Sequence, residues 1–353
     1  MLGHWLRGIF GRASGEGESR AQVGAGGAPS TGAGAALARE ARAHDAQPWM
    51  DVSALMAIRS IELRVRRLVE GLNRGIHRSV RRGYSTEFTE YRPYTPGDDL
   101  RHMDWRRLAR TDRPYVRQYE DESDWGCVFV ADLSASMAFG SLGHSKADYA
   151  RTLVGTLAAF LHGQGDAVGL LRFAQDAVGM VPVRHTPRQL TRFWPLLEAD
   201  ASGAGTDLGK ALEGAALLLK RPGLVVVASD LLTPPASWRE PLRVLRAARH
   251  EVVFFEVLDP QELEFSFEGD TRFENLETPL ALELDALGAR AGYLEKLRVH
   301  REEVAAACAR ESVPLFASRT DAPLEPVLRE ALAAISRLRP LGGARQAAPG
   351  GGG

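Results

Sequence analysis

The sequence predicts an α/β protein whose main domain contains a doubly wound, mostly parallel sheet. Two apolar runs, residues 127–131 and 224–228, lack polar alternation and are typical of strands buried on both faces. After Trp125, strand-like and helix-like segments alternate, which is the order expected of βαβ units. A chain of 353 residues with 44% hydrophobic residues is long enough to bury the core that such a sheet requires.

The segments ahead of this domain differ in composition. Residues 1–46 are mostly rich in Gly and Ala, and we expect a disordered tail because few large apolar side chains offset the entropy of ordering. Residues 52–122 are interpreted as a helix followed by a small β module. The helix is indicated by Ile61, Val65, Leu68 and Leu72 at helical spacing, and the module by β-forming residues around the turn 95–98.

The main domain is expected to span residues 123–338, followed by a disordered tail over 339–353. Strands are predicted near 126–132, 167–173, 178–183, 224–229, 251–257 and 313–318. Helices are predicted near 146–162, 187–197, 207–219, 238–249, 289–310 and 323–338. Right-handed crossovers between parallel strands then bring the loops after residues 131, 203 and 229 to one edge of the sheet.

Oxygen-bearing side chains follow these predicted strands. Asp132, Ser134 and Ser136 alternate after the first strand, Thr206 precedes a helix after a glycine-rich turn, and Asp230 follows the strand near 224–229. Ligands of α/β folds bind at this edge, and an oxygen-only set favours a hard cation such as Mg²⁺. An alternative stays open, in which Ser134 or Ser136 merely caps the next helix.

The order of these three motifs resembles the metal-ion-dependent adhesion site of a von Willebrand factor A domain. Upstream, the block 87–105, followed by 109–111 and 116–120, is similar to the signature of the bacterial domain of unknown function 58 family. Later traits of that family are Asp259, Glu262, Glu277, Tyr293 and His300. The resemblance covers roughly residues 63–338.

This resemblance implies a von Willebrand A-like fold and a non-enzymatic protein-binding role. One Mg²⁺ or Mn²⁺ would be bound directly by Ser134 and Ser136, and directly or through water by Thr206, Asp230 and Asp132. An acidic residue of a partner protein would complete its coordination. Relatives of this kind resemble accessory factors of MoxR-type AAA+ ATPases in protein maturation or assembly, so such an ATPase or its client is the expected partner.

A Mg²⁺-dependent hydrolase or phosphotransferase is the alternative class, because Mg²⁺ beside acids also suits phosphoryl transfer. The sequence lacks a G-x-x-x-x-G-K-[ST] phosphate loop and a G-x-S-x-G elbow, and position 134 is a serine where a DxDx[TV] nucleophile motif needs aspartate. Most of its histidines occur singly, without the spacing of metal ligands. These observations favour the binding role.

Charge and cysteine content narrow the remaining choices. The net charge of −1 predicts no nucleic-acid partner, and the arginine-rich stretch from Arg59 to Arg82 is interpreted as a solvated helix face because it has no interleaved aromatic platforms. Two cysteines, Cys127 and Cys308, support no disulfide framework, so the cytoplasm is expected. No apolar run approaches the roughly 20 residues of a membrane span, although residues 1–12 offer a short amphipathic segment for peripheral membrane contact.

Overall fold

The computed structural model describes residues 51–80, 90–93, 110, 115–118, 125–174, 179–200, 207–267, 270–274 and 281–339. A sheet of six strands forms its centre, in the order β10-β7-β6-β3-β4-β5. The strands are β3 (Gly126–Asp132), β4 (Ala167–Phe173), β5 (Gly179–Arg184), β6 (Leu224–Ser229), β7 (Glu251–Leu258) and β10 (Leu315–Arg319). Only the edge strand β5 is antiparallel to its neighbour, so the predicted doubly wound, mostly parallel sheet is confirmed.

The chain changes direction across the sheet between β3 and β6. From β3 it proceeds to β4 and β5 on one side, and it then returns to place β6, β7 and β10 on the other side. Val128 pairs with Val225 and Val130 with Val227, so the two strands run in register and end at the same edge. Ligands of open α/β sheets bind beside such a switch point, outside the carboxyl ends of the strands.

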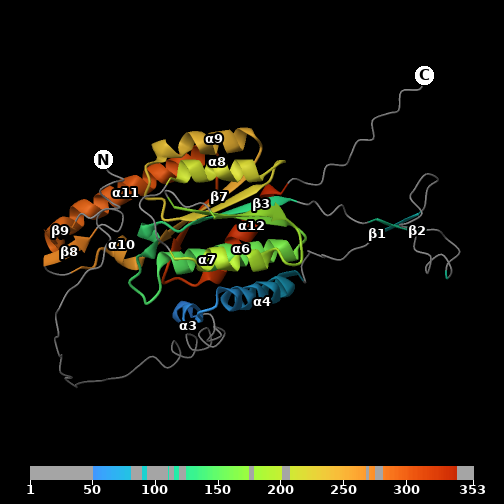
Figure 1. Ribbon diagram of the computed structural model, residues 1–353, viewed down its shortest axis with the longest axis horizontal. Coiled ribbons are helices and arrows are strands. Elements are labelled where there is room, and N and C mark those ends of the chain that lie inside the picture. Colours follow the sequence, from blue (N-terminus) through green and yellow to red (C-terminus); the bar gives the residue numbers. More distant parts are fainter. Residues whose placement is uncertain are drawn as a thin grey trace, which may run out of the picture.

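Helices cover both faces of the sheet (Figure 1). One face carries α6 (Lys146–Gly163), α7 (Trp194–Glu198) and α12 (Leu324–Leu338), and the other carries α8 (Leu208–Leu218), α9 (Arg239–Ala247) and α11 (Ala286–Arg310). Because both faces are covered, β3 and β6 are buried almost throughout, as their uninterrupted apolar sequences predict. Among the described residues, no helix has both the length and the apolar character needed to span a membrane.

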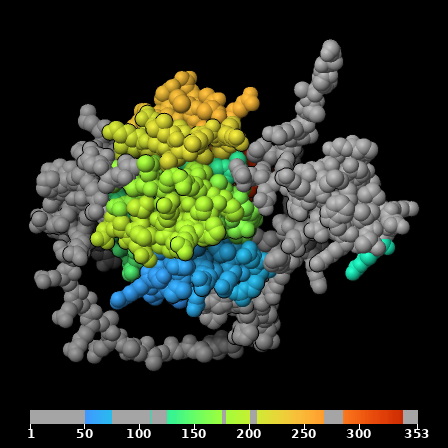
Figure 2. Space-filling view, turned by 45° about the vertical axis from the view of Figure 1, so that its right-hand side comes forward, coloured from blue at the N-terminus to red at the C-terminus, as the bar shows by residue number. Residues whose placement is uncertain are grey.

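The helical pattern near the amino end forms two helices. α3 (Val52–Met56) ends before α4 (Ile61–Val80) begins, and α4 covers most of the stretch from Arg59 to Arg82 that was interpreted as a helix face. The four apolar residues that predicted the helix are all buried in the core on the α6 face. Figure 2 shows α4 in blue as an outer layer of the molecule. Of the predicted β module, the described part is one antiparallel pair, β1 (Glu90–Pro93) with β2 (Tyr115–Gln118).

Three short elements between β7 and α11 were not predicted. They are α10 (Pro260–Glu264) and the antiparallel pair β8 (Asp270–Glu274) and β9 (Ala281–Asp285). Together with the start of α11 they gather at one end of the sheet (Figure 1). Phe265, Phe267 and Tyr293 pack there in a third apolar cluster. The predicted helix near 187–197 forms as two short helices, η4 (Leu190–Arg192) and α7, with Phe193 between them. Pro195 lies in the first turn of α7, where proline is tolerated.

Candidate metal centre

Four of the five predicted site residues meet at the switch point. Asp132 ends β3, Ser134 and Ser136 lie at the start of η3 (Ala135–Ala138), and Asp230 directly follows β6. The hydroxyls of Ser134 and Ser136 are 3.1 Å apart, and Ser136 donates to Oδ2 of Asp230 at 2.8 Å. The backbone N–H of Ser134 donates to Oδ1 of Asp132 at 3.0 Å. Thr206, the fifth residue, lies outside the described residues.

Capping of the next helix, the alternative role considered for Ser134 or Ser136, is absent from the described contacts. Ser134 precedes η3 but makes no side-chain capping hydrogen bond. The following helix, α6, is capped by Ser145, whose side chain accepts from the N–H of Asp148 while the Asp148 carboxylate accepts from the N–H of Ser145. Asp132, Ser134, Ser136 and Asp230 together are called the acidic centre. The Ser134 and Ser136 hydroxyls are therefore directed to this centre and not to a helix end.

Burial shapes the charges of this centre, because Asp132, Ser134, Ser136 and Asp230 are each at most 4% exposed. Burial, together with the charge of Asp230, raises the pKa of Asp132 to about 7, although hydrogen bonds from Ser229 and Ser134 oppose the rise. Burial would also raise the pKa of Asp230, but the charge and hydrogen bond of Lys146 outweigh it and bring that pKa below its ordinary value.

Lys146, which the sequence reasoning missed, supplies the positive charge of the centre. Its side chain is fully buried, and its Nζ donates to Oδ2 of Asp230 at 3.0 Å and to Oε1 of Glu262 at 2.6 Å. Burial alone would lower the pKa of Lys146, but the charges of Asp230 and Glu262 outweigh burial and raise it. A signal was present in the sequence, because the capping pair Ser145 and Asp148 makes Lys146 the first residue of α6, beside the sheet edge.

Glu262 links the centre to the elements that were not predicted. It is the third residue of α10 and forms a second capping box, in which its Oε2 accepts from the N–H of Asp259 at 2.9 Å. Asp259 in turn accepts from both the N–H and the hydroxyl of Ser141 and from the hydroxyl of Thr320. Burial raises the pKa of Glu262 to about 7 against the opposing charge of Lys146. Asp259 and Glu262, first noted as family traits, thus hold α10 against the centre.

Hydrogen bonds of Ser229 and His300 hold the turn after β6 in place. The Ser229 hydroxyl donates to Oδ2 of Asp132 at 2.5 Å and accepts from the N–H of Leu231 at 3.1 Å. Leu231 adopts a left-handed backbone with φ of 52°, an unfavourable conformation for a residue with a branched side chain. Its carbonyl lies 2.8 Å from Nε2 of the buried His300 on α11. These contacts fix the direction in which Asp230 leaves the strand.

The donor set suits a hard divalent cation, since the described members present only carboxylate and hydroxyl oxygens within hydrogen-bonding distance of one another. Over the described ranges, no group of three or more His, Cys, Asp or Glu residues is arranged to hold a metal ion. A cation at this centre would be held mainly by serine oxygens, with few carboxylates. Lys146 already contacts one of these carboxylates.

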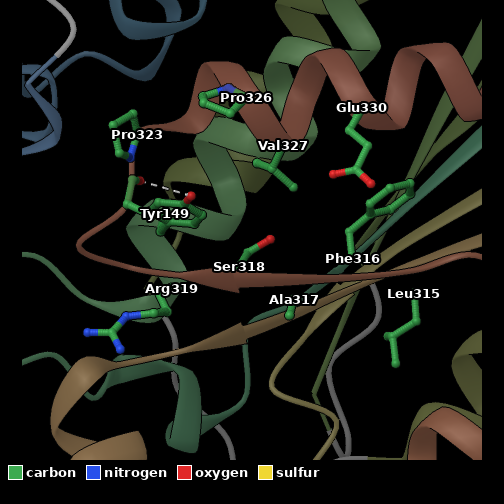
Figure 3. Close-up of a pocket in the computed structure, with 11 residues that line it drawn as sticks. Tyr149, Leu315, Phe316, Ala317, Ser318, Arg319, Pro323, Pro326, Val327 and Glu330 are labelled. Atoms are coloured by element: carbon green, nitrogen blue, oxygen red, sulfur yellow. Dashed lines mark hydrogen bonds between the residues drawn. The ribbon is translucent and has the colours of Figure 1, made fainter.

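A separate hollow of about 350 Å³ lies at the far edge of the sheet, between β10 and α12 (Figure 3). Phe316, Pro323, Pro326 and Val327 line it, and the Tyr149 hydroxyl donates across one end to the carbonyl of Ala322 at 3.1 Å. Arg319 at its rim is already paired with Glu264 and Asp321. The hollow is mostly apolar and shares no side chain with the acidic centre, so it is a distinct feature.

Comparison with known proteins places this architecture in a family. Residues 90–303, more than half of the chain, match the family described as "Protein of unknown function DUF58". The uncharacterized proteins Rv1480 of Mycobacterium tuberculosis and Mb1516 of Mycobacterium bovis are each 34% identical over 276 residues, covering 77% of this chain and 86% of the relative. None of these descriptions assigns an activity.

Two solved structures are more distant. The conserved hypothetical protein BatB from Bacteroides thetaiotaomicron is 18% identical with a TM-score of 0.41, covering 60% of this chain and 97% of that protein. The SpRpn10 VWA domain is 12% identical with a TM-score of 0.34, covering 58% and 93%. The family match covers more than half of the chain and the mycobacterial relatives are 34% identical over most of it, so the chain belongs to the DUF58 family.

Proposed function

We propose that this protein is a non-enzymatic binding module that docks another protein at the carboxyl edge of its sheet. The observation that carries the proposal is the convergence of Asp132, Ser134, Ser136 and Asp230 at the switch point, from two separate parts of the chain. Such a set offers several oxygens but few charges. A cation bound there would keep a coordination position that an acidic side chain of a partner can fill.

The proposed cation is one Mg²⁺ or Mn²⁺, held by Asp132, Ser134, Ser136, Thr206 and Asp230. When bound, it supplies a fixed positive charge with a coordination position for a partner's carboxylate. The serine hydroxyls and Asp230 are the side chains that would orient it. Because all four described residues are nearly inaccessible, docking requires the elements beside the centre to move. α10 is one such element, since Glu262 connects it to Lys146.

The state of Lys146 argues against hydrolytic chemistry at the same centre. A serine nucleophile needs a neighbouring base, and a lysine can act as that base only when its pKa is depressed. Here the net effect of the surroundings raises the pKa of Lys146. The hydroxyl of Ser136 donates its hydrogen bond to the carboxylate of Asp230. Neither group is prepared to activate the other. The pair of Ser136 and Lys146 therefore gives no support to the alternative of a Mg²⁺-dependent hydrolase or phosphotransferase.

The proposed partner is a MoxR-type AAA+ ATPase of the same bacterium, or its client, in the cytoplasm. This choice follows from the family resemblance and not from a contact in the structure. It gives the docking hypothesis a defined reagent, because such an ATPase can be purified and immobilised.

The test measures binding of the purified full chain to that ATPase with Mg²⁺ or with EDTA. Ser134→Ala/Ser136→Ala removes two hydroxyls of the centre, and we expect its affinity to fall at least about tenfold, with EDTA reproducing the loss in the parent. Ser237→Ala is the matched control, because its hydroxyl is exposed and contacts only the carbonyl of Pro234 among the bonds described. Undiminished binding by a folded double variant would place recognition elsewhere, with the arginine-rich helix α4 as the next surface.

A further inference from the structure

The positive charge inside the acidic centre belongs to one residue. Lys146 is among four lysines in a chain with 44 lysines and arginines, and its side chain is completely buried. An ammonium is a compact charge, whereas the planar guanidinium of arginine is larger and needs a fork of acceptors. In a chain that otherwise uses arginine for almost every cation, the buried position between two carboxylates is therefore suited to lysine.

The ammonium and the serine cluster share one oxygen. Oδ2 of Asp230 accepts from Nζ of Lys146 at 3.0 Å and from the hydroxyl of Ser136 at 2.8 Å. A cation bound by Ser136 and Asp230 would have to approach that same oxygen. Two positive charges within a few ångströms of each other in a buried site repel strongly, because little water lies between them to screen the repulsion. The ammonium and the cation compete for Asp230.

The charge balance of the centre also favours competition between the ammonium and a cation. Asp132, Asp230 and Glu262 are three buried carboxyl groups, and Lys146 is the single cationic side chain bonded to them among the described contacts. With Lys146 in place, Asp230 and Glu262 have a counter-ion without any metal. Without it, the same carboxylates would be buried and uncompensated, which is costly unless another cation enters.

We propose that the ammonium of Lys146 and a divalent cation are mutually exclusive occupants of the acidic centre, so that Lys146 sets the cation affinity of the site. This inference takes the ligands of the cation from the proposed function and adds how their occupancy is controlled. In the structure, Lys146 supplies the positive charge that faces Asp230 and Glu262. Entry of a cation requires Lys146 to leave Asp230, and the bond to Glu262 at 2.6 Å gives it a place to remain paired.

The test compares Mn²⁺ binding to the full-length parent and to Lys146→Met, by electron paramagnetic resonance of free Mn²⁺ and by thermal melts with Mn²⁺ or EDTA. We expect the variant to bind Mn²⁺ at least about tenfold more tightly than the parent. It should melt earlier than the parent in EDTA and recover most of the difference in Mn²⁺. Lys220→Met, which removes an exposed lysine at the opposite end of α8 from Asp207, should match the parent in both measurements.

A second variant covers the case in which Lys146→Met does not fold. Lys146→Met/Glu262→Gln removes one positive and one negative charge together, which leaves less uncompensated charge, and it should also bind Mn²⁺ more tightly than the parent. Equal Mn²⁺ affinity in the parent and in a folded variant would overturn the competition, as would the absence of Mn²⁺ binding in both. Equal Mn²⁺ affinity leaves the docking proposal standing, whereas absence of Mn²⁺ binding in both proteins would also remove its proposed cation. The docking test separates the two, because it measures loss of the ATPase after Ser134 and Ser136 are changed and does not involve Lys146.

Discussion

Glu262→Gln should destabilise the protein far more than the same change two residues later. Glu262 is 1% exposed and is bonded to Lys146 at 2.6 Å, whereas Glu264 on the same short helix is 53% exposed and pairs with Arg319 at 2.9 Å. Breaking a buried ion pair costs about 3–5 kcal/mol, and we expect about 3 kcal/mol because Lys146 keeps Asp230. Glu264→Gln should cost no more than about 1 kcal/mol, the upper range for exposed pairs.

Urea unfolding and thermal melts at about pH 8.5, above the raised pKa of Glu262, measure both variants, because Glu262 is then ionised. A loss of about 3 kcal/mol corresponds to a decrease in Tm of about 6–12 °C for a domain of this size. Adding Lys146→Met to Glu262→Gln should cost less than the sum of the two single changes, since each single change leaves the other charge without its partner. Equal losses from Glu262→Gln and Glu264→Gln would refute the reasoning, because the buried pair would then contribute no more than an exposed one.

Two other predictions concern the body of the domain. Arg301→Met should lower the free energy of unfolding by about 2–3 kcal/mol, because it leaves the buried Glu256 without its bidentate partner. Arg298→Met on the same helix should leave the urea midpoint nearly unchanged, because its glutamate partners are exposed. Similar midpoints for the two variants would contradict this. Burial lowers the pKa of His250, whose Nδ1 accepts from the N–H of Gly223. The stability that neutral His250 contributes is therefore present above its ordinary pKa of 6.5 and is lost as the pH falls from there through the lowered pKa of the folded protein. His250→Asn should flatten this dependence between neutral and mildly acidic pH, and an unchanged slope in urea midpoints would assign it to other groups.

The sequence predicted those features that depend on local pattern and strand order. Two uninterrupted apolar runs identified β3 and β6, and the residues after them had to meet because parallel neighbours end at one edge. Asp132, Ser134, Ser136 and Asp230 were found on that basis. Thr206, predicted with them, lies outside the described residues and stays a prediction.

Lys146 and Glu262 could not be predicted as a pair, because 116 residues separate them and neither has an apolar pattern that implies burial. The capping boxes showed only that a helix begins beside each residue. β8 and β9 were missed for a related reason, since both strands carry several charged residues and neither has the apolar run that identified the central strands.

The two hydrogen bonds that Lys146 donates, to Asp230 and to Glu262, also constrain how this centre can change in evolution. A lineage that loses the lysine first inherits buried carboxylates without a counter-ion, and one that loses Glu262 first weakens the attachment of α10. Intermediates with one partner alone should therefore be rare among members of the family. Lysine at the first position of α6 and glutamate at the third position of α10 should be inherited together or replaced together, and homologues that replace both are the natural place to look for a centre that depends on metal alone.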